Sequence, residues 1–447
     1  MEFFGYYRKM NDWKAGKADG HKGHKISSLE HVCLTYGEKM KIAFINQRYG
    51  LEVAGGSESY TRAMAEHLAE YLKGKAEVEV LTSKASDYIT WEDDYEEDVE
   101  TIHHVTVRRF SVKHKRSRAL QRGAGILMRY FHIHFKWLEE LRLKARGPYV
   151  PKLVSYIREH RDEYDAFIFV TYLYYPAYFG AKEVYDKAWF IPTAHDEEPI
   201  YMNIYKELFT KVKGIVYLTS EEKTFVEGLF KNREIPNRVL GMGIEVSENA
   251  DENRFRQKYD IWGDYLLFAG RIEENKGCRE LVDYFVRYKE QLCEETGENA
   301  GGKQRELTLL LMGKSLMEIP ERNDIRYVGF VSDRDKYDGM KGAKVICLPS
   351  KYESFSISLL EGMAFGNPAL VNGECHVLKG HVERSGGGFY YTGYEEFKEG
   401  LRKLLEPDVN EETGKKAVAY VREEYGWDRI IGRFCEMLSG GKTDAGN

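Results

Sequence analysis

Two carboxylates are the side chains of this chain best placed to do chemistry. Glu353 and Glu361 lie eight positions apart around a serine-rich run. Ser354 or Ser356 is a natural N-cap, so we predict that a short helix begins within this run. Glu353 then precedes the helix, whereas Glu361 lies inside it, about 80° further round by the helical period. The two acids therefore flank the start of the helix.

The start of this predicted helix is an anion-binding site. The first backbone N–H groups of a helix have no partner within it, and together with the helix dipole they attract a phosphate. An acid on either side suits groups that are rich in hydroxyls. The segment therefore fits a nucleotide diphosphate-sugar, with the sugar on Glu353 and the ribose on Glu361. A capped helix with two solvated acids is the simpler interpretation of the segment taken alone.

Two cations follow a predicted strand upstream of this segment. Residues 266–269 are apolar and precede Arg271 and Lys276, and a helix is predicted to start near Gly277. In an open α/β sheet, the carboxyl ends of the strands border the crevice in which ligands usually bind. Arginine offers phosphate a planar fork, and lysine offers a compact charge. Arg271 and Lys276 are therefore expected to neutralise the diphosphate.

Residues 270–277 (GRIEENKG) and residues 353–361 (ESFSISLLE) together resemble the retaining glycosyltransferases of family 4, also called glycosyltransferases group 1. Those enzymes have the GT-B fold, in which two Rossmann-like parallel-sheet domains face each other across a cleft. The resemblance covers most of the chain, from about Met40 to the last helix. Other parts match in order, namely residues 41–46, Gly55-Gly56, Thr193-Ala-His-Asp196, Gly241-Met-Gly-Ile-Glu245 and Trp427.

The resemblance implies a retaining, metal-independent transfer of a hexosyl unit from a nucleotide diphosphate-sugar to an acceptor hydroxyl. It implies no cofactor, a UDP-, GDP- or ADP-sugar as donor, and a carbohydrate or lipid-linked acceptor in cell-surface polysaccharide or glycolipid synthesis. The residues implied in catalysis are His195, Glu353, Arg271 and Lys276. Those implied in binding the donor are Gly55, Gly56, Arg271, Lys276, Ser356, Ile357, Ser358 and Glu361.

The sequence departs from the family pattern in two places. Related enzymes usually have glycine after the phenylalanine of the second motif, where this chain has Ser356. A side chain there narrows the approach of the donor, so the departure bears on which donor is used more than on whether the site is active. The segment after Asn372 also lacks the more usual glycine-rich run.

Strand-like and helix-like runs alternate from Lys41 onward, which predicts an α/β protein with parallel sheets. A chain of 447 residues is long enough for two domains, each with its own core. We expect an N-terminal extension at residues 1–39, an acceptor-binding domain at 40–245 and a nucleotide-sugar-binding domain at 246–420. Residues 421–447 are expected to hold a last helix that crosses back to the first domain, followed by a tail.

The bulk composition argues against several classes of protein. The formal net charge is −6 and no nucleic-acid recognition motif is present, so no nucleic-acid partner is expected. Six cysteines occur without a metal-binding spacing, and we expect them to be reduced thiols of a cytoplasmic protein. No apolar segment is long enough to predict a membrane span, and the N-terminus has no secretory pattern.

The segment from Arg108 to Arg146 has the strongest charge asymmetry of the chain. It contains twelve lysines and arginines but only two acids, Glu139 and Glu140, and aromatic residues are interleaved with the cations. Such a stretch can contact an anionic membrane at its inner face or hold an anionic, lipid-linked acceptor. A solvated basic face is an equally good interpretation.

Other functions fit parts of the pattern. Two carboxylates also serve glycoside hydrolases, but Arg271 and Lys276 would then have no purpose. A non-catalytic GT-B partner subunit and a nucleotide-sugar epimerase are further alternatives.

The triplet Asp333-Arg-Asp335 spells the metal and diphosphate motif of the other large glycosyltransferase fold. It follows Ser332 and precedes a helical run. We therefore interpret Ser332 and Asp335 as residues of a helix start, and we expect no metal site.

Overall fold

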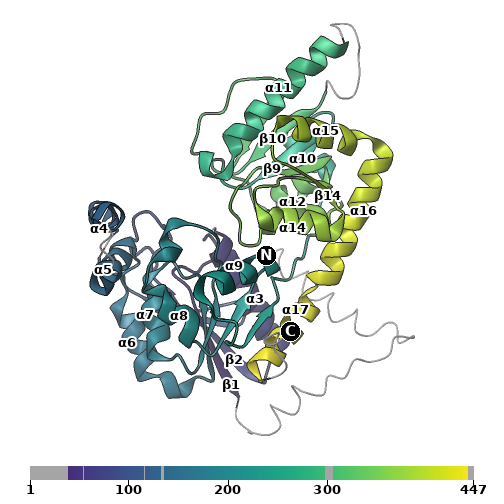
Figure 1. The fold of residues 1–447 in the computed structure, drawn as a ribbon. Coiled ribbons are helices and arrows are strands. Elements are labelled where there is room, and N and C mark those ends of the chain that lie inside the picture. Colours follow the sequence, from purple (N-terminus) through teal and green to yellow (C-terminus); the bar gives the residue numbers. More distant parts are fainter. Residues whose placement is uncertain (1–38, 54, 115, 132–134, 297–305, 441–447) are drawn as a thin grey trace. The chain divides into compact units, whose positions relative to one another are not determined.

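The computed structural model describes residues 39–53, 55–114, 116–131, 135–296 and 306–440 (Figure 1). Residues 1–38 of the expected N-terminal extension lie outside the described residues. The described residues form two sheets in which strands alternate with helices along the chain. The predicted α/β class with two Rossmann-like, parallel-sheet domains is confirmed.

The first sheet has eight strands in the order β3-β4-β2-β1-β5-β6-β7-β8. All neighbours are parallel except β3, which pairs with β4 in the antiparallel sense. Four of its strands, β1, β5, β6 and β7, are largely apolar runs, as expected where helices cover a parallel sheet. The strands are β1 (Met40–Ile45), β2 (Ala76–Ser83), β3 (Val99–Ile102), β4 (Val105–Phe110), β5 (Ala166–Val170), β6 (Ala188–Ile191), β7 (Gly214–Tyr217) and β8 (Asn237–Val239).

The helices of the first half bury their apolar faces in one core. In α3, for example, Met64 and Leu68 are fully buried one turn apart, as the helical spacing of apolar residues requires. Tyrosine and phenylalanine side chains make up a large part of the core cluster around β5 and β6. The helices are α3 (Gly56–Tyr71), α4 (Arg118–Phe131), α5 (Lys136–Arg146), α6 (Pro151–Glu159), α7 (Tyr175–Glu183), α8 (Tyr205–Lys211) and α9 (Ser220–Phe230).

The second sheet has six parallel strands in the order β11-β10-β9-β12-β13-β14. The strands are β9 (Tyr265–Ala269), β10 (Thr308–Met312), β11 (Ile325–Gly329), β12 (Val345–Leu348), β13 (Ala369–Asn372) and β14 (Gly388–Tyr391). The helices with it are α10 (Glu252–Tyr259), α11 (Cys278–Thr296), α12 (Asp333–Lys341), α13 (Ile357–Ala364), α14 (His376–Ser385), α15 (Tyr394–Leu405) and α16 (Pro407–Glu424). The expected domain boundary after residue 420 falls inside α16.

The last described helix, α17 (Trp427–Leu438), packs against α3 of the first half. Trp427 stacks on His67 with ring centroids 3.7 Å apart, and Phe434 stacks on Phe44 of β1 at 6.4 Å. The backbone of Gly243 comes so close to Trp427 that an added Cβ would lie 2.1 Å from the indole ring. Glycine is therefore required where the chain passes this helix.

Each sheet has one point at which the strand order reverses. In the first sheet this point lies between β1 and β5, and in the second it lies between β9 and β12. The loops that follow the two strands lead away in opposite directions, and they leave a crevice at the carboxyl ends of the strands. The sequence-predicted site residues Arg271 and Glu353 follow β9 and β12, the two strands at the reversal of the second sheet.

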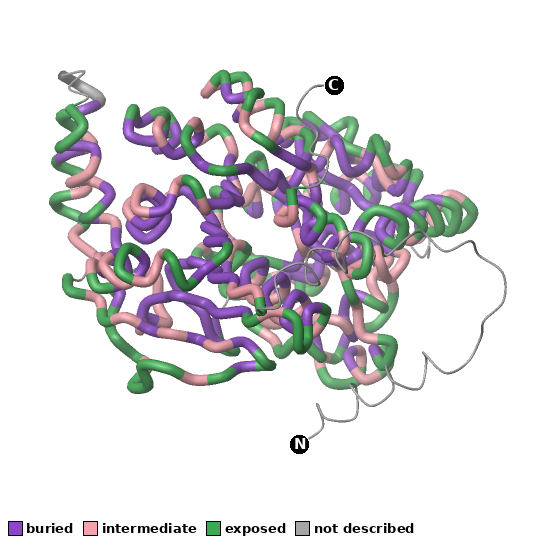
Figure 2. Tube along the Cα trace, turned by 90° about the horizontal axis from the view of Figure 1, so that it is seen from below, coloured by how far each residue is buried: buried purple, intermediate pink, exposed green. Residues whose placement is uncertain are grey.

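Burial follows the same plan. The central strands β5, β9 and β12 run through buried positions, whereas the helices alternate between buried and exposed ones (Figure 2). Within the described ranges, no helix is both long enough and apolar enough to cross a bilayer.

Candidate active site

Lys276 and Glu353 form an ion pair at the carboxyl ends of β9 and β12. The Lys276 Nζ donates a hydrogen bond to Glu353 Oε1 at 2.8 Å. Lys276 ends a short 3₁₀ turn, Glu274–Lys276, that follows β9, and Glu353 lies in the loop before α13. The structure therefore brings the first motif and the second motif together, although 77 positions separate them.

Gly277 makes this close approach possible. Its φ of +73° lies in the left-handed region, and an added Cβ would stand 2.3 Å from the carbonyl oxygen of Pro349. A side chain would separate the loop after β9 from the loop after β12. Glycine is thus required at position 277 of the first motif so that the two loops can pack together.

Arg271 also follows β9, but its side chain is about half exposed, at 52%. One of its nitrogens lies 3.4 Å from Glu273 Oε1, and another donates to the hydroxyl of Tyr88 at 3.5 Å. Tyr88 belongs to the first half, in the segment after β2. Arg271 therefore stands beside residues of both halves and keeps an exposed guanidinium.

The first turn of α13 has no side-chain cap. Ser356 occupies the N-cap position with φ +66° and ψ +70°, and its hydroxyl does not accept a hydrogen bond from the helix. The prediction that the helix begins at Ser354 or Ser356 is confirmed at Ser356, although the serine side chain makes no capping hydrogen bond. Among the described residues, no side chain accepts from the N–H groups of Ile357 and Ser358. These groups are left for a ligand.

Ser356 carries two local costs. A left-handed conformation costs an L-residue roughly 1–2 kcal/mol, and glycine avoids this cost. Ser356 is 8% exposed, and its hydroxyl oxygen is buried with no hydrogen-bond partner among the described residues. This conformation explains why glycine suits the position in related enzymes.

His381 holds the peptide just before Ser356. Its Nε2 donates to the carbonyl oxygen of Phe355 at 3.0 Å, so its Nδ1 must accept from the hydroxyl of Tyr420 at 2.9 Å. Burial lowers the pKa of His381 to about 4, which keeps the imidazole neutral for both hydrogen bonds. Nothing in the local sequence indicates this residue, because its partners lie 26 and 39 positions away.

Glu361 lies in α13 and is also largely buried. One of its oxygens accepts from Lys336 Nζ at 2.8 Å and from the hydroxyl of Tyr337 at 3.2 Å. A carboxylate has about four acceptor sites, so Glu361 keeps capacity for a further donor. Lys336 and Tyr337 belong to α12 and were not anticipated as partners.

His195 follows β6 in the first half and lies against the loop of Glu353. Its ring centroid is 6.2 Å from that of Tyr352, the residue before Glu353. Its Nε2 is 3.7 Å from Glu197 Oε1, and its Nδ1 is buried without a partner among the described residues. The structure thus places His195 beside the residue that precedes Glu353 in the second motif.

Glu222 fixes the backbone next to His195, and the sequence interpretation missed it. Its two oxygens accept from the N–H groups of Ala194 and Leu218, both at 2.6 Å. Burial raises the pKa of this carboxyl to about 8. The signal for it was the pattern Thr219-x-x-Glu222, in which the Thr219 hydroxyl caps α9 by accepting from the Glu222 N–H.

Gly55 and Gly56 open α3 at the end of β1. An added Cβ at Gly55 would stand 2.4 Å from a carboxylate oxygen of Glu58, whereas Gly56 has open space. Glu58 is held in place by Arg48, whose Nε donates to it at 2.9 Å. Gly55 is therefore required by the buried Arg48–Glu58 pair, while the backbone at Gly56 stays accessible.

Two threonines at the carboxyl edge of the first sheet have left-handed backbones. Thr171 follows β5 with φ +63°, and Thr193 follows β6 with φ +52°. This conformation is a genuine outlier for a β-branched residue, and such strain is concentrated at functional sites. The edge that carries His195 is therefore strained at two neighbouring strands.

The Asp333-Arg-Asp335 triplet forms the first turn of α12. The Ser332 hydroxyl accepts from the Asp335 N–H at 3.2 Å, and Lys258 pairs with Asp335 at 2.8 Å. The interpretation of Ser332 and Asp335 as helix-start residues is confirmed. Within the described ranges, no three His, Cys, Asp or Glu side chains are grouped so as to hold a metal ion.

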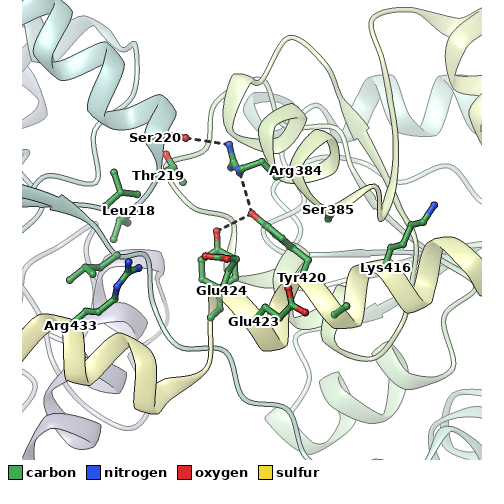
Figure 3. Close-up of a pocket in the computed structure, with 14 residues that line it drawn as sticks. Leu218, Thr219, Ser220, Arg384, Ser385, Lys416, Tyr420, Glu423, Glu424 and Arg433 are labelled. Atoms are coloured by element: carbon green, nitrogen blue, oxygen red, sulfur yellow. Dashed lines mark hydrogen bonds between the residues drawn. The ribbon is translucent and has the colours of Figure 1, made fainter. Parts of the chain in front are cut away.

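A cavity of about 450 Å³ lies away from these residues (Figure 3). Its wall includes Ser220, Arg384 and Tyr420, and Arg384 donates to the hydroxyls of both others at 3.3 Å. None of the sequence-predicted site residues lines it. Tyr420 connects its wall to His381 and so to the backbone of Phe355.

The basic segment forms the α4–α5 hairpin, two helices that pack on each other. Sixteen large apolar side chains are exposed among the described residues, and five of them belong to this hairpin and its connection. Exposed cations such as Arg122 and Lys144 stand on the same helices. The five apolar residues are Leu120, Ile126, Leu127, Phe135 and Trp137.

Residues 249–423 match the model of the family described as glycosyl transferases group 1. This match covers the second sheet and the helices from α10 to α15. The mannosylfructose-phosphate synthase of Agrobacterium fabrum is 31% identical over 144 residues, which are 28% of this chain and 31% of that protein. The chain spans 30 to 60% of the length of the curated relatives it matches.

Solved structures share the fold over a longer part of the chain. The sucrose-phosphate synthase from Thermosynechococcus elongatus superposes with a TM-score of 0.64 at 17% identity, covering 90% of this chain and 99% of that one. HepE from Anabaena, solved in complex with UDP and glucose, gives 0.61 at 15% identity, covering 90% and 100%. Identities this low show the fold alone, which is the GT-B fold of glycosyltransferases.

Proposed function

We propose that this protein is a retaining, metal-independent glycosyltransferase that moves a hexosyl unit from a nucleotide diphosphate-sugar to an acceptor hydroxyl. The observation that carries the proposal is the Lys276–Glu353 ion pair beside the uncapped start of α13, at the strand reversal of the second sheet. A cation, an acid and free helix N–H groups are what a diphosphate and a sugar need in one place.

The diphosphate would be bound by cations and backbone together. Arg271 and Lys276 supply two positive charges, and the N–H groups of Ile357 and Ser358 supply hydrogen bonds. Charge that develops on the leaving phosphate is then stabilised by groups already oriented in the free protein. The leaving phosphate itself takes the proton from the acceptor, so the proposal requires no separate protein base.

The sugar and the ribose would be held by the acids and by His195. Glu353 accepts from sugar hydroxyls, and His195, which lies against the same loop, contacts the sugar from the first half. Glu361 accepts from the ribose with the capacity that Lys336 and Tyr337 leave unused. The open backbone at Gly56 borders the substrates on the side of the first half, beside Gly55.

The donor is a UDP-, GDP- or ADP-sugar, and the acceptor is a carbohydrate or a lipid-linked molecule of cell-surface polysaccharide or glycolipid synthesis. The presence of UDP in the structure of HepE makes a UDP-sugar the first to test. The alternatives are a non-catalytic GT-B partner subunit and an epimerase that converts the donor without an acceptor.

Calorimetric titration with UDP, GDP and ADP, followed by turnover assays with the matching sugars, tests the proposal. Arg271→Ala and Lys276→Ala should weaken binding of the preferred nucleotide, since each removes a phosphate contact. Glu353→Gln should lower turnover by about a hundredfold while nucleotide affinity stays nearly unchanged. Binding of no nucleotide, or equal losses in both measurements for Glu353→Gln, would contradict it. Conversion of the donor sugar without acceptor, followed by NMR, would identify an epimerase.

The α4–α5 hairpin supports a further part of the proposal, contact with the anionic inner face of a membrane. Exposed Trp137 and Ile126 can enter the headgroup region, while the cations of the hairpin attract anionic lipids. This contact would bring the protein to a lipid-linked acceptor.

A further inference from the structure

Two arginines of the first half carry positive charge that no acid balances. Arg116 lies in the loop between β4 and α4, and Arg146 ends α5. Among the described residues, no carboxylate forms an ion pair with either guanidinium. Arg116 and Arg146 are partly buried. Three more deeply buried arginines of the first half each have a carboxylate partner, in the pairs Arg48–Glu58, Arg109–Glu100 and Arg142–Glu198.

Arg116 is the more constrained of the two. Its Nη1 donates to the carbonyl oxygen of Tyr88 at 3.4 Å, and its Nε is buried with no partner among the described residues. Burial and the nearby charge of Arg146 lower the pKa of Arg116. The Ser117 N–H donates to the carbonyl oxygen of Ala145 at 3.1 Å, so the backbone brings Arg116 and Arg146 close together. Two like charges therefore lie near each other where water is partly excluded, an arrangement that an anion would stabilise.

Trp91 joins Arg146 to a tyrosine that faces both cations. The Trp91 indole nitrogen donates to the carbonyl oxygen of Arg146 at 2.8 Å, and its ring meets that of Tyr174 edge-on at 5.6 Å. Burial and the charge of Glu58 raise the pKa of Tyr174, whereas the charges of Arg146, Arg48 and Arg116 act in the opposite direction. The structure shows no protein partner for that hydroxyl within the described ranges.

This group lies beside the proposed donor site. Tyr88 accepts from Arg116 through its backbone carbonyl and from Arg271 through its hydroxyl, so one residue connects the two sets of cations. Tyr174 follows β5, which borders the strand reversal of the first sheet. An acceptor held at this edge would therefore meet the donor sugar close to its diphosphate.

We propose that Arg116, Arg146 and Tyr174 bind a phosphate group carried by the acceptor. Each guanidinium offers two parallel N–H donors to phosphate oxygens, and the Tyr174 hydroxyl donates a further hydrogen bond. The inference rests on the proposed function and narrows its acceptor to phosphorylated molecules. The phosphate belongs either to a soluble sugar phosphate or to a lipid head group, and both present the same chemistry to the site.

Binding of matched acceptors to the full chain tests this inference. Glucose and glucose 6-phosphate, fructose and fructose 6-phosphate are titrated by calorimetry. Vesicles that contain phosphatidylserine are compared with vesicles that contain the same fraction of phosphatidic acid, an anionic lipid whose head group is a phosphate monoester. We expect at least one phosphate monoester to bind about tenfold or more tightly than its counterpart. Binding of the free sugar phosphate identifies a soluble acceptor, and a preference seen only with vesicles identifies a lipid.

Single variants assign the phosphate to these side chains. Arg116→Gln and Arg146→Gln should each lower the affinity for the phosphorylated ligand by about ten- to a hundredfold, and Tyr174→Phe should lower it by less. Arg158→Gln is the matched control, because Arg158 is an exposed arginine of the same half. Thermal unfolding of Arg116→Gln and Arg146→Gln should show no loss of stability, since each removes an unbalanced charge.

Two results would overturn the inference. One is equal binding of the two members of every pair, including the two kinds of vesicle. The other is a loss of phosphate binding in Arg158→Gln as large as in Arg116→Gln or Arg146→Gln. UDP and GDP affinities are measured on the same samples and should stay unchanged. Phosphate binding that survives without any sugar transfer would refute the transferase while leaving the anion site in place.

Discussion

The Lys276–Glu353 ion pair joins a proposed phosphate contact to a proposed sugar contact. Removing either partner leaves the other side chain without its partner, so the effects of the two changes are coupled. Arg271 forms no ion pair with Glu353 among the described residues. The effects of changing Arg271 and Glu353 on activity are therefore expected to be independent. Coupling between the effects of the two changes therefore distinguishes a functional ion pair from polar residues that act separately.

We predict that Lys276→Met and Glu353→Gln are non-additive in kcat/KM by about 0.5 kcal/mol or more. Turnover of the single and double variants measures the coupling. Arg271→Ala combined with Glu353→Gln serves as the comparison and should be additive. Additive behaviour of the Lys276 and Glu353 variants would show that the ion pair does not function as a unit.

Ser356 gives a second prediction at this scale. Ser356→Gly should be more stable than Ser356→Ala by about 1 kcal/mol, because only glycine adopts φ +66° without strain. Chemical denaturation of both variants measures the difference. If Ser356→Ala equals or exceeds Ser356→Gly in stability, the left-handed conformation is not the conformation of this residue in solution.

The acids and cations of the site could be found from the sequence because each lies within a short, ordered motif. Their partners could not. Lys336, Tyr337 and His381 reach the motif residues from helices that are distant in sequence, and no local pattern marks them. The left-handed conformation of Ser356 could not be predicted from the sequence either, because a serine in this run is typical of an ordinary N-cap.

At the scale of elements, the α4–α5 hairpin has a composition that neither core packing nor solubility explains. Met128, Leu138 and Leu143 are buried in the core, but five large apolar side chains of the hairpin are exposed, and α4 contains no acid. An exposed apolar surface with cations around it fits the interface of an anionic bilayer. The hairpin can therefore be tested as a separate feature of the proposed function.

We predict that the protein sediments with vesicles that contain phosphatidylserine but not with pure phosphatidylcholine. Arg122→Gln should weaken this binding about fivefold, at roughly 1 kcal/mol per cation. Ile126→Ser combined with Trp137→Ser should weaken it further, whereas Leu316→Ser, an exposed leucine outside the hairpin, should not. Equal binding to both kinds of vesicle would exclude an electrostatic contact.

Elements with continuous apolar runs were predictable, and elements without them were not. β5 and β9 follow directly from their buried runs, whereas β3 and β4 alternate charged and apolar residues and escaped the sequence interpretation. β8 is only three residues long. Their places in the sheet are set by neighbouring strands, which a local pattern does not contain.

At the scale of the whole molecule, two histidines make stability depend on pH, His67, which is partly buried, and His381, which is fully buried. Burial lowers the pKa of both His67 and His381 to about 4 in the fold, against 6.5 in the unfolded chain. His67 also faces Asp428, which acts in the opposite direction, and His381 faces Arg384 and the more distant Glu221. Between these two pKa values the unfolded state binds protons that the folded state does not.

We therefore predict that the free energy of unfolding is unaffected by these groups above pH 6.5 and falls as the pH drops toward 4. The contribution of His381 is about 1.4 kcal/mol per pH unit. Denaturation across this range should show a shallower slope for His381→Gln and for His67→Gln than for the unsubstituted protein. Identical slopes in all three proteins would assign the acid sensitivity to other groups.

The contact between α17 and the first sheet has a consequence for synthesis on the ribosome. Phe44 and His67 are translated 390 and 360 residues before their respective partners Phe434 and Trp427. N-terminal domains generally fold first during synthesis. The nascent first half therefore exposes an aromatic surface until α17 has been translated. A message truncated before codon 427 would release a product in which that surface stays open, a natural client for chaperones.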